Sequence, residues 1–579
     1  MRVLFLYPPP WKIPADGQRP DCEDGPPEGY RATDIDGDFF QMPYGVLTLA
    51  SVVREAGHRV KVLNLSNFSW EKVEEVIDNV EADVFGMSCF TANRRGVALV
   101  ARAIKGRYPK ACVVVGGPHV TALARETLLY IPDVDVVVMG EGERTLLEVL
   151  DRIGRGVGFG GVCGVAYRAG ESVVVGERRG RVRDLDTIPY PHKYYRTHLF
   201  MTSRGCPGEC TFCAKGTVWG RVYRVHSWEY VLDGFEAALA RLPVKMVLVK
   251  DDTFTVDRKR VIRICDGIRS RKLNFLWSCD TRVDMLDEEL LVSMRLAGCV
   301  RLSLGVESGS PTILRNIRKK VGLEQVLHAT KLAKRVGMQV RYYMMLGNRG
   351  ETSATLQETF AFLRSAAPHQ AIFACLSIYP GTDDFQLMQN NGWIDSEIFF
   401  KEDFQEIKTP FDASDADTQL MSDWFEMNRG LRTLHIPSVQ ECVEILARFT
   451  NLHTAHMDLG AAYFRTGALD QATHHIQKAL DLRYPAPGLA NNFLACICAT
   501  KKDYTGMMAY LKQAQYDPYY PVLARNLLII KNWQAKGCPP DCTLPLIARH
   551  DFELMELPEQ PSLPGPLPPD YSSWEENDC

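Results

Sequence analysis

The chain has 579 residues and a formal net charge of −4, from 67 basic and 71 acidic side chains. This length is too great for one hydrophobic core and predicts several domains. No basic excess argues for nucleic acid as a partner. No apolar run approaches a membrane span, and the apolar start at residues 3–7 stops at prolines, as a strand does and a signal peptide does not. Seventeen cysteines without a secretion signal indicate a reducing, cytoplasmic setting.

Residues 1–153 alternate short apolar runs with amphipathic stretches. Continuous apolar strands separated by helices are typical of a parallel sheet covered on both faces. We therefore expect a doubly wound (Rossmann-like) α/β domain whose ligand lies at the carboxyl ends of the strands. The expected strands are residues 3–7, 60–65, 84–90, 112–115 and 134–139.

Residues 154–197 are expected to be a linker between domains. A glycine-rich start makes the segment flexible, and two short runs around Gly170 read as a β-hairpin. Prolines then stiffen residues 185–191, which we expect to fix one domain on the next.

Residues 198–395 carry six strand signals separated by helical patterns. Six β/α units imply a partial (β/α)6 barrel, in which a site lies at the carboxyl ends of the strands. Each of these ends carries polar or small residues, and six such ends in register predict one site. The expected strands are residues 198–203, 246–250, 275–279, 301–306, 340–346 and 372–379.

Residues 396–557 are expected to form an all-α region. Leu459-Gly460, Tyr463 and Ala472 resemble the tetratricopeptide pattern, and a second, weaker copy follows one period later. Two repeats are too few for a free-standing solenoid, so we expect them to pack on the barrel or on each other and to offer a surface to a protein partner. The proline-rich, acidic tail at 558–579 is expected to be disordered.

Three cysteines, Cys206, Cys210 and Cys213, follow the first barrel strand in a C-x-x-x-C-x-x-C spacing. A short loop can aim three thiolates at one point, and iron–sulfur clusters take thiolate ligands. The alternatives are a zinc site or buried free thiols, but structural zinc takes four ligands and no fourth Cys or His lies at zinc-finger spacing. Three ligands on four irons leave one iron open.

With Phe212 before the last cysteine, this motif resembles the signature of the radical S-adenosylmethionine (SAM) enzymes, whose fold is also a partial barrel. The resemblance implies a [4Fe–4S] cluster that binds SAM at its open iron and, on reduction, yields a 5′-deoxyadenosyl radical. It also implies an electron donor of the flavodoxin or ferredoxin type.

The same resemblance assigns SAM-binding positions to the other strand ends. Residues 305–310 resemble the motif that holds the ribose, where a carboxylate accepts from two vicinal hydroxyls. The second strand end would lie beside the methionine amino group and the fifth near adenine, although the usual proline is changed there. The alternative for the two aspartates and the arginine is a rim ion pair. The expected set is Phe212, Asp251, Asp252, Arg282, Glu307, Ser308 and Gly347.

Polar and glycine residues also follow the strands of the first domain. Each group could be only a tight turn, but as a set they resemble the cobalamin-binding domain of one large class of radical SAM enzymes. In that domain a serine and a Gly-Gly pair line the slot for the nucleotide tail, and glycine lets the backbone approach the ligand. The expected cobalamin residues are Tyr44, Ser88, Thr91, Gly116, Gly117, His119, Gly140, Glu141, Gly142 and Glu143.

One departure from this class concerns the lower face of cobalt. Many cobalamin domains carry Asp-x-His-x-x-Gly, but none of the thirteen histidines here has an aspartate two residues before it. We therefore expect a lower ligand other than histidine, or none, which would favour nucleophilic Co(I). His119 is the alternative ligand, although its place in a turn favours a hydrogen-bonding role.

The resemblance implies a cobalamin-dependent radical SAM enzyme. The leading function is methyl transfer from SAM, via methylcobalamin, to an unactivated carbon or a phosphorus of a small-molecule or peptide substrate. The same cofactors could instead serve a radical oxidative cyclisation or rearrangement. A methylthiotransferase is disfavoured because Cys22, Cys89 and Cys112 are not arranged as the three additional N-terminal cysteines that this group needs for a second cluster. A non-catalytic repeat scaffold is the remote alternative, since a scaffold has no need of three clustered thiolates.

Overall fold

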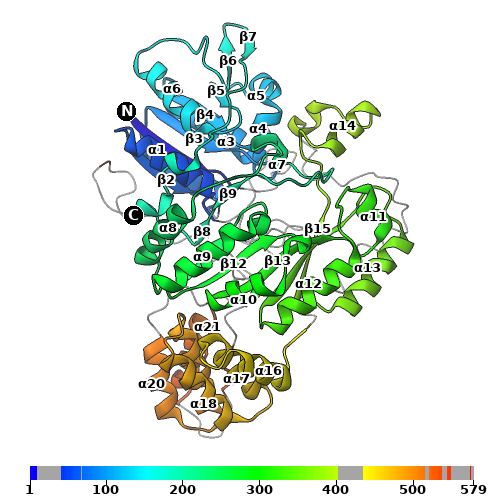
Figure 1. Ribbon diagram of the computed structural model, residues 1–579. Helices are drawn as coiled ribbons and strands as arrows, with labels where there is room; N and C mark the ends of the chain where they lie inside the picture. The colour runs from blue at the N-terminus through cyan, green and yellow to red at the C-terminus, as the bar shows by residue number, and fades with distance from the viewer. Residues whose placement is uncertain are drawn as a thin grey trace.

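The computed structural model describes residues 1–9, 41–66, 68–401, 435–514, 521–537, 544–548 and 574. Figure 1 shows an α/β domain, a barrel and a helical region in succession, with the barrel in the middle. The predicted disordered tail lies outside the described residues except for Trp574, as does much of the start of the expected helical region, at 402–434.

The N-terminal sheet has the strand order β2-β1-β3-β4-β5-β6-β7. Pairing is parallel from β2 to β5 and antiparallel from β5 to β7. The expected hairpin therefore forms, but it extends this sheet and is no part of a free linker. It covers the edge of β5, whose three valines are buried. The strands are β1 Arg2–Tyr7, β2 Arg59–Asn64, β3 Val84–Ser88, β4 Cys112–Gly116, β5 Val136–Val138, β6 Val165–Ala169 and β7 Ser172–Val175.

Helices cover both faces of this sheet, which confirms the predicted doubly wound class. Along β1, Val3 and Phe5 pack with α1 and α6, whereas Leu4 and Leu6 pack with α2 and α3. Alternate residues thus face opposite helical layers, as the two-residue period of a strand requires. The helices are α1 Tyr44–Glu55, α2 Trp70–Asn79, α3 Arg94–Arg107, α4 Pro118–Ala122, α5 Ala124–Tyr130 and α6 Gly142–Gly154.

The second sheet has six parallel strands in the order β15-β14-β13-β12-β11-β8, the predicted partial barrel. The sixth strand ends at Cys375, short of the predicted end. The first predicted strand is divided, because β9 Ser203–Arg204 leaves the barrel and pairs antiparallel with β10 Arg224–Val225. The barrel strands are β8 Leu199–Phe200, β11 Met246–Val249, β12 Leu276–Thr281, β13 Cys299–Glu307, β14 Gln339–Leu346 and β15 Gln370–Cys375.

Helices follow the barrel strands and pack outside them, as Figure 1 shows for α9, α10, α12 and α13. They bury a continuous apolar core between themselves and the sheet. The helices of this part are α7 Lys215–Val218, α8 Trp228–Arg241, α9 Arg258–Ser270, α10 Glu288–Leu296, α11 Pro311–Asn316, α12 Leu323–Arg335, α13 Ser353–Ala366 and α14 Asp383–Asn390.

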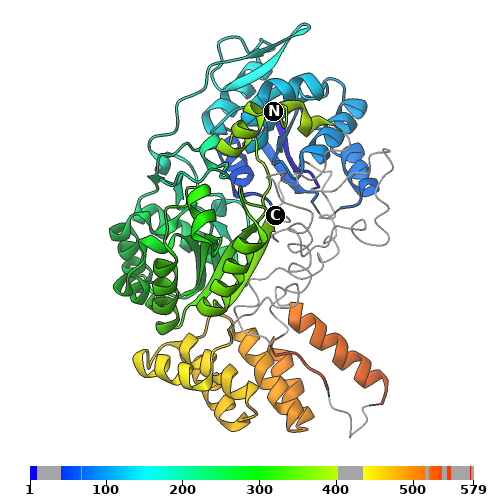
Figure 2. The ribbon, with the colours of Figure 1, turned by 90° about the vertical axis from the view of Figure 1, so that its right-hand side faces the viewer.

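The helical region packs under the barrel, at the end opposite the α/β domain (Figures 1 and 2). Met457 and Leu489 share an apolar cluster with Val244 and Leu276 of the barrel. Gly460 brings α17 close to α18, because an added Cβ would lie 2.6 Å from Ile476. The tetratricopeptide resemblance stays a prediction. The helices are α16 Val439–Arg448, α17 His453–Arg465, α18 Leu469–Asp481, α19 Pro487–Thr500, α20 Tyr504–Ala514 and α21 Pro521–Ala535.

Among the described residues, no helix combines the length and the apolar character that crossing a membrane requires.

Candidate active site

The cysteine loop joins β9 to α7 and holds three free thiols, Cys206, Cys210 and Cys213. The sulfur of Cys206 accepts a hydrogen bond from the Gly208 amide at 3.3 Å, and a Cβ on Gly208 would lie 3.4 Å from that sulfur and 4.0 Å from the sulfur of Cys210. Within the described chain, no three His, Cys, Asp or Glu side chains converge as a single metal ion would need. A cluster differs, because each thiolate binds its own iron.

Burial raises the pKa of the Cys210 and Cys213 thiols. Cations oppose this effect: Lys319 and Arg282 lower the pKa at Cys210, and Lys215 lowers it at Cys213. The loop is thus a half-buried, thiol-rich pocket bordered by positive charge. Such a site suits a group that bonds to sulfur directly and holds it as thiolate.

The entry to the loop is fastened by Asp251, which is 1% exposed. Its carboxylate accepts hydrogen bonds from the amide and hydroxyl of Thr202, both at 2.5 Å, and from those of Ser203 at 3.1 and 2.7 Å. Arg260 completes the network by donating to the Thr202 carbonyl at 2.8 Å. Sequence reasoning expected Asp251 at the methionine amino group and missed this anchoring, in which the chain itself engages both carboxylate oxygens.

Asp252 contacts the residues on both sides of the cysteine motif. It accepts from the Gly205 amide at 3.0 Å and lies 3.1 Å from Lys215 Nζ. Because Gly205 precedes Cys206 and Lys215 follows Cys213, one carboxylate ties together both ends of the cysteine loop.

Arg282 and Glu307 are the expected SAM residues that act electrostatically on the cysteines. Arg282 pairs with Asp284 at 2.9 Å, and one of its nitrogens would lie 3.3 Å from a Cβ on Gly208. Glu307 has a φ of +70° and accepts from Lys319 Nζ at 2.8 Å. A non-glycine residue held in this backbone region is uncommon and clusters at functional sites.

The remaining expected SAM residues shape the loops around that carboxylate. Ser308 is fully buried and bonds to Thr359 Oγ1 at 3.1 Å. The Gly347 amide donates to Glu351 at 2.5 Å. Phe212 packs against Ile313 and its neighbours on α11 and the following turn. Of the expected SAM residues, Arg282 and Glu307 therefore present charge to the cysteines. Ser308 and Gly347 hold their loops through hydrogen bonds, and Phe212 contributes packing.

A cavity of about 410 Å³ lies between the α/β domain and the barrel. The strand ends of the first sheet and the amino-terminal ends of α1 and α6 form one wall, and Ser203, Arg204, Ala214 and Lys215 form part of the other. Those four residues flank the cysteine loop on both sides, so the cavity borders it. The expected cobalamin residues that line the cavity are Tyr44, Ser88, Gly116, Gly117, Gly140, Glu141, Gly142 and Glu143.

Thr91 and His119, also expected at cobalamin, lie outside this cavity lining. His119 Nδ1 is 3.1 Å from Thr91 Oγ1, and the ring meets Phe399 edge-on at 5.3 Å. Burial lowers the pKa of His119 to about 3. The histidine is therefore a buried, neutral residue outside the cavity lining. The histidine that does line the cavity, His226, comes from the barrel side and bonds to Asp186 at 3.2 Å.

Sequence reasoning also missed Arg204, which lies two residues before Cys206. Arg204 donates to Glu143 at 2.5 Å and stands 3.5 Å from Glu141, so it pairs with two of the expected cobalamin residues. The position of Arg204, just before the cysteine motif, is the sequence signal that could have indicated this role.

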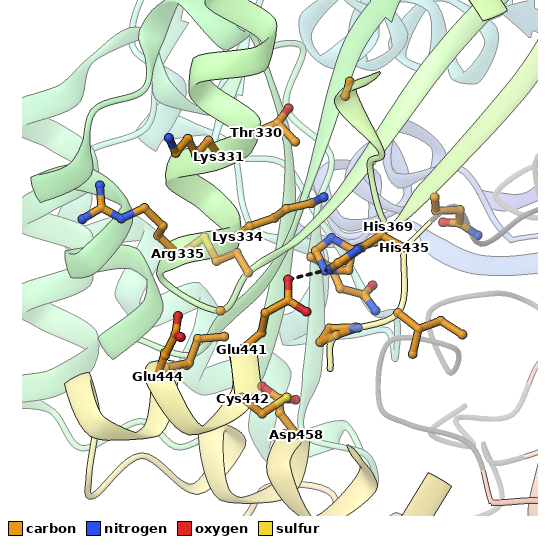
Figure 3. Close-up of a pocket in the computed structure, with 18 of the residues that line it drawn as sticks. Thr330, Lys331, Lys334, Arg335, His369, His435, Glu441, Cys442, Glu444 and Asp458 are labelled. Atoms are coloured by element: carbon orange, nitrogen blue, oxygen red, sulfur yellow. Dashed lines mark ion pairs between the residues drawn. The ribbon is translucent and has the colours of Figure 1, made fainter. Parts of the chain in front are cut away.

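A second cavity, of about 870 Å³, lies at the opposite end of the barrel, against α16 (Figure 3). Lys334 and His369 meet His435 and Glu441 there, the last two 3.1 Å apart. This cavity is larger, but it lies at the amino-terminal ends of the strands, away from the cysteines. The chemistry therefore belongs to the smaller cavity.

Comparisons with known proteins agree with this geometry. Residues 37–150 match the B12 binding domain family, and residues 200–363 match the Radical SAM superfamily. The chain is 31% identical over 353 residues to an uncharacterized methyltransferase of Pyrococcus horikoshii, a match that spans 59% of this chain and 77% of that protein. The chain belongs to the cobalamin-dependent radical SAM enzymes.

Two further known proteins resemble this chain. An anaerobic magnesium-protoporphyrin IX monomethyl ester cyclase of Rubrivivax gelatinosus is 29% identical over 365 residues, 59% of this chain and 66% of that protein. The solved methyltransferase TsrM of Kitasatospora setae, with cobalamin and a [4Fe–4S] cluster bound, shares the fold with a TM-score of 0.54 at 17% identity. That match covers 67% of this chain and 75% of TsrM.

The cofactors of this radical SAM enzyme are a [4Fe–4S] cluster, SAM and cobalamin. The residues present fit all three groups: three free thiols on one loop, a charged strand-end carboxylate beside them, and an interdomain cavity with small residues on the cobalamin-domain wall.

Proposed function

We propose that this enzyme transfers a methyl group from SAM to an unactivated carbon or a phosphorus of a small-molecule or peptide substrate. The observation that carries the proposal is the shared cavity, which borders both the cobalamin-domain strand ends and the cysteine loop. The identity to a protein named as a methyltransferase supports it.

In this proposal Cys206, Cys210 and Cys213 hold the cluster. With SAM the cluster supplies a substrate radical, and cobalamin supplies the methyl carrier. The chain's own part is geometric: Asp251 and Asp252 fix the loop, so the thiolates keep a set distance from the cobalamin wall. A fixed distance matters because the radical must meet the methyl carrier before any other partner.

The SAM pocket in this proposal is built on Glu307, with Lys319 as its partner. The pair is nearly buried, at 10% and 8% side-chain exposure, so each oxygen of the carboxylate keeps a defined direction. One oxygen accepts from Lys319, which leaves the other for the ribose hydroxyls. Arg282 lies near Cys206 and Cys210, where it offsets the negative charge of the ligands.

Apolar side chains from both domains line the cavity. Phe5, Val114, Val138 and Leu146 come from the cobalamin domain, and Trp219 and Tyr230 come from the barrel side. A dry space protects a carbon radical from solvent and strengthens the electrostatic contacts around it.

Two partners belong to the same proposal. The reaction consumes electrons, so we include a flavodoxin- or ferredoxin-like donor. The helical region lies at the end of the barrel opposite the α/β domain, and we include it as a surface for a protein partner.

The test is anaerobic reconstitution with iron, sulfide and hydroxocobalamin, then incubation with SAM and reductant. About four irons and one cobalt per chain are expected, with S-adenosylhomocysteine appearing beside 5′-deoxyadenosine. Cys213→Ala should lose iron, whereas the matched change Cys265→Ala, at a buried thiol in the barrel core, should keep it. Iron without cobalt, or 5′-deoxyadenosine alone, would exclude methyl transfer.

The second candidate is oxidative cyclisation with the same cofactors. The 29% identity to a cyclase favours it specifically. The same assay separates the two, because a cyclase forms 5′-deoxyadenosine without S-adenosylhomocysteine.

A further inference from the structure

A buried network of four charges joins the cobalamin domain to the cysteine loop. Glu141 and Glu143 stand at the amino-terminal end of α6, and Arg204 and Arg224 lie opposite each other on β9 and β10. Arg204 donates to Glu143 at 2.5 Å, and Arg224 donates to both oxygens of Glu141. The strand pair that leads into the cysteines is thereby clamped to one helix of the other domain.

The network is fixed by more than its charges. The Arg204 guanidinium lies over the Trp219 ring, 4.7 Å from its centroid. Glu141 also accepts from the Val182 amide at 2.6 Å, and Arg224 donates to the Val182 carbonyl at 2.5 Å. Cation–π contact and backbone bonds leave these side chains little freedom to reorient.

Two atoms of the network make no hydrogen bond within the described chain: Arg204 Nη1, which stands 3.5 Å from Glu141 Oε1 in an ion pair, and Glu143 Oε2. Both residues are only 7% exposed, and both line the cavity. A buried donor or acceptor without a partner costs about 1–3 kcal/mol, more when it is charged. A donor and an acceptor that make no hydrogen bond in one buried network therefore call for a ligand group that offers the opposite pair.

We propose that Arg204 and Glu143 form a binding site for a primary carboxamide on the rim of the corrin ring. An amide carbonyl accepts from Arg204 Nη1, and its NH₂ donates to Glu143 Oε2. Corrin carries acetamide and propionamide side chains on its rim, so one such group can bind both atoms. This inference rests on cobalamin occupying the cavity, and it adds a specificity: the site selects the amide over the corresponding carboxylic acid.

The geometry gives the site a second role as a positioning contact. Because Arg204 lies two residues before Cys206, an amide held by Arg204 is held at a fixed distance from the cluster loop. The corrin rim and the loop then share one anchor.

The experiment compares cobalamin with derivatives in which a single side-chain amide is hydrolysed to the carboxylic acid. Binding to anaerobically reconstituted enzyme is followed by visible absorbance after equilibrium dialysis. Wild type is expected to bind one of these monoacids at least tenfold more weakly than cobalamin, because its carboxylate faces Glu143 and has no proton to donate.

Glu143→Gln should reverse this preference. The glutamine oxygen can still accept from Arg204, and its NH₂ then faces the ligand as a donor, which suits a carboxylate. We expect this variant to bind the same monoacid at least as well as cobalamin. The matched control is Glu148→Gln on the same helix, which pairs with Arg179 away from the cavity lining and should keep the wild-type preference.

Iron content and thermal unfolding report whether Glu143→Gln is folded. If it is not, Glu143→Asp, which keeps the charge but shortens the reach, should bind cobalamin at least fivefold more weakly and keep the preference for the amide. Wild-type affinity for cobalamin in Glu143→Asp, or an unchanged amide preference in folded Glu143→Gln, would overturn the site. Failure of wild type to bind cobalamin at all would instead remove the cofactor on which the proposal rests.

Discussion

The strand ends of the two sheets lie around the same interdomain cavity and differ in the residues that they carry. The first sheet ends in small residues, and Gly116, Gly117 and Gly140 line the cavity. The barrel ends in charged residues such as Asp251, Asp252 and Glu307, which bond to the chain around the cysteine loop.

This difference follows from what each edge has to hold. A large flat ligand needs space and backbone contact, and absent side chains provide both. A cluster loop of few residues has little packing of its own, so neighbouring strand ends must hold it through hydrogen bonds. The first sheet therefore has an open edge, where glycines leave space for a ligand. The barrel has a rigid edge, where hydrogen bonds hold the cysteine loop.

The largest expected effect is at Asp251 on the rigid edge. Asp251→Ala removes the acceptor of four hydrogen bonds and leaves Arg260 without its buried countercharge, at a cost of roughly 3–5 kcal/mol. Denaturant unfolding and iron counting should show lower stability and loss of the cluster together. The control is Asp266→Ala, at a surface pair on α9, which should cost less than about 1 kcal/mol. A stable Asp251→Ala variant that keeps its iron would contradict the anchoring role.

The next effect tests the open edge with two adjacent glycines. Gly117 has a φ of +111°, and an added Cβ would lie 2.6 Å from the Cys89 carbonyl oxygen, so Gly117→Ala should cost about 3 kcal/mol. At Gly116 the nearest atom would be 3.5 Å away, an ordinary contact. Gly116→Ala should therefore leave stability within about 0.5 kcal/mol of wild type.

Cobalamin affinity completes that comparison. A methyl group at Gly116 enters the wall of the cavity, so Gly116→Ala should bind hydroxocobalamin more weakly at unchanged stability. Equal affinity would mean that this glycine does not serve close approach of the ligand.

The sequence predicted the strands and the cysteine loop, but not the contacts that the charged residues at the strand ends make. Apolar runs and their spacing predicted both sheets, and the cysteine spacing predicted the loop. The partners of the charged residues were out of reach, because Arg204 meets Glu143 across 61 positions and Asp251 meets Thr202 across 49. The hairpin was misplaced for the same reason: periodicity shows that β6 is a strand, but not that its neighbour is β5.

A moderate effect is expected at Glu307 on the rigid edge. Glu307→Gln keeps the shape but removes the charge opposite Lys319, and it weakens one acceptor for the ribose hydroxyls. We expect SAM to bind about tenfold more weakly, which is about 1.4 kcal/mol. Calorimetry with the cluster loaded measures it, and Glu324→Gln, a substitution in the first turn of α12, is the control. Iron content should stay at the wild-type level, since Glu307 is no cluster ligand; lost iron would show that it supports the loop instead.

The smallest effect is expected at His119, a buried residue two positions after Gly117 of the open edge. Burial, and to a lesser extent Arg94, lowers its folded-state pKa to about 3, below the ordinary value near 6.5. A depressed pKa means that the unfolded chain binds the proton first, so the stabilising contribution is present above pH 6.5 and declines as pH falls toward 3. At pH 5.5 the loss is about 1 kcal/mol. His119→Gln does not titrate there, so its unfolding free energy should fall less than that of wild type between pH 7 and pH 5.5. Parallel pH profiles would show that His119 takes up its proton in the folded protein at its ordinary pKa, and its surroundings would then be more open to water than the packing against Phe399 implies.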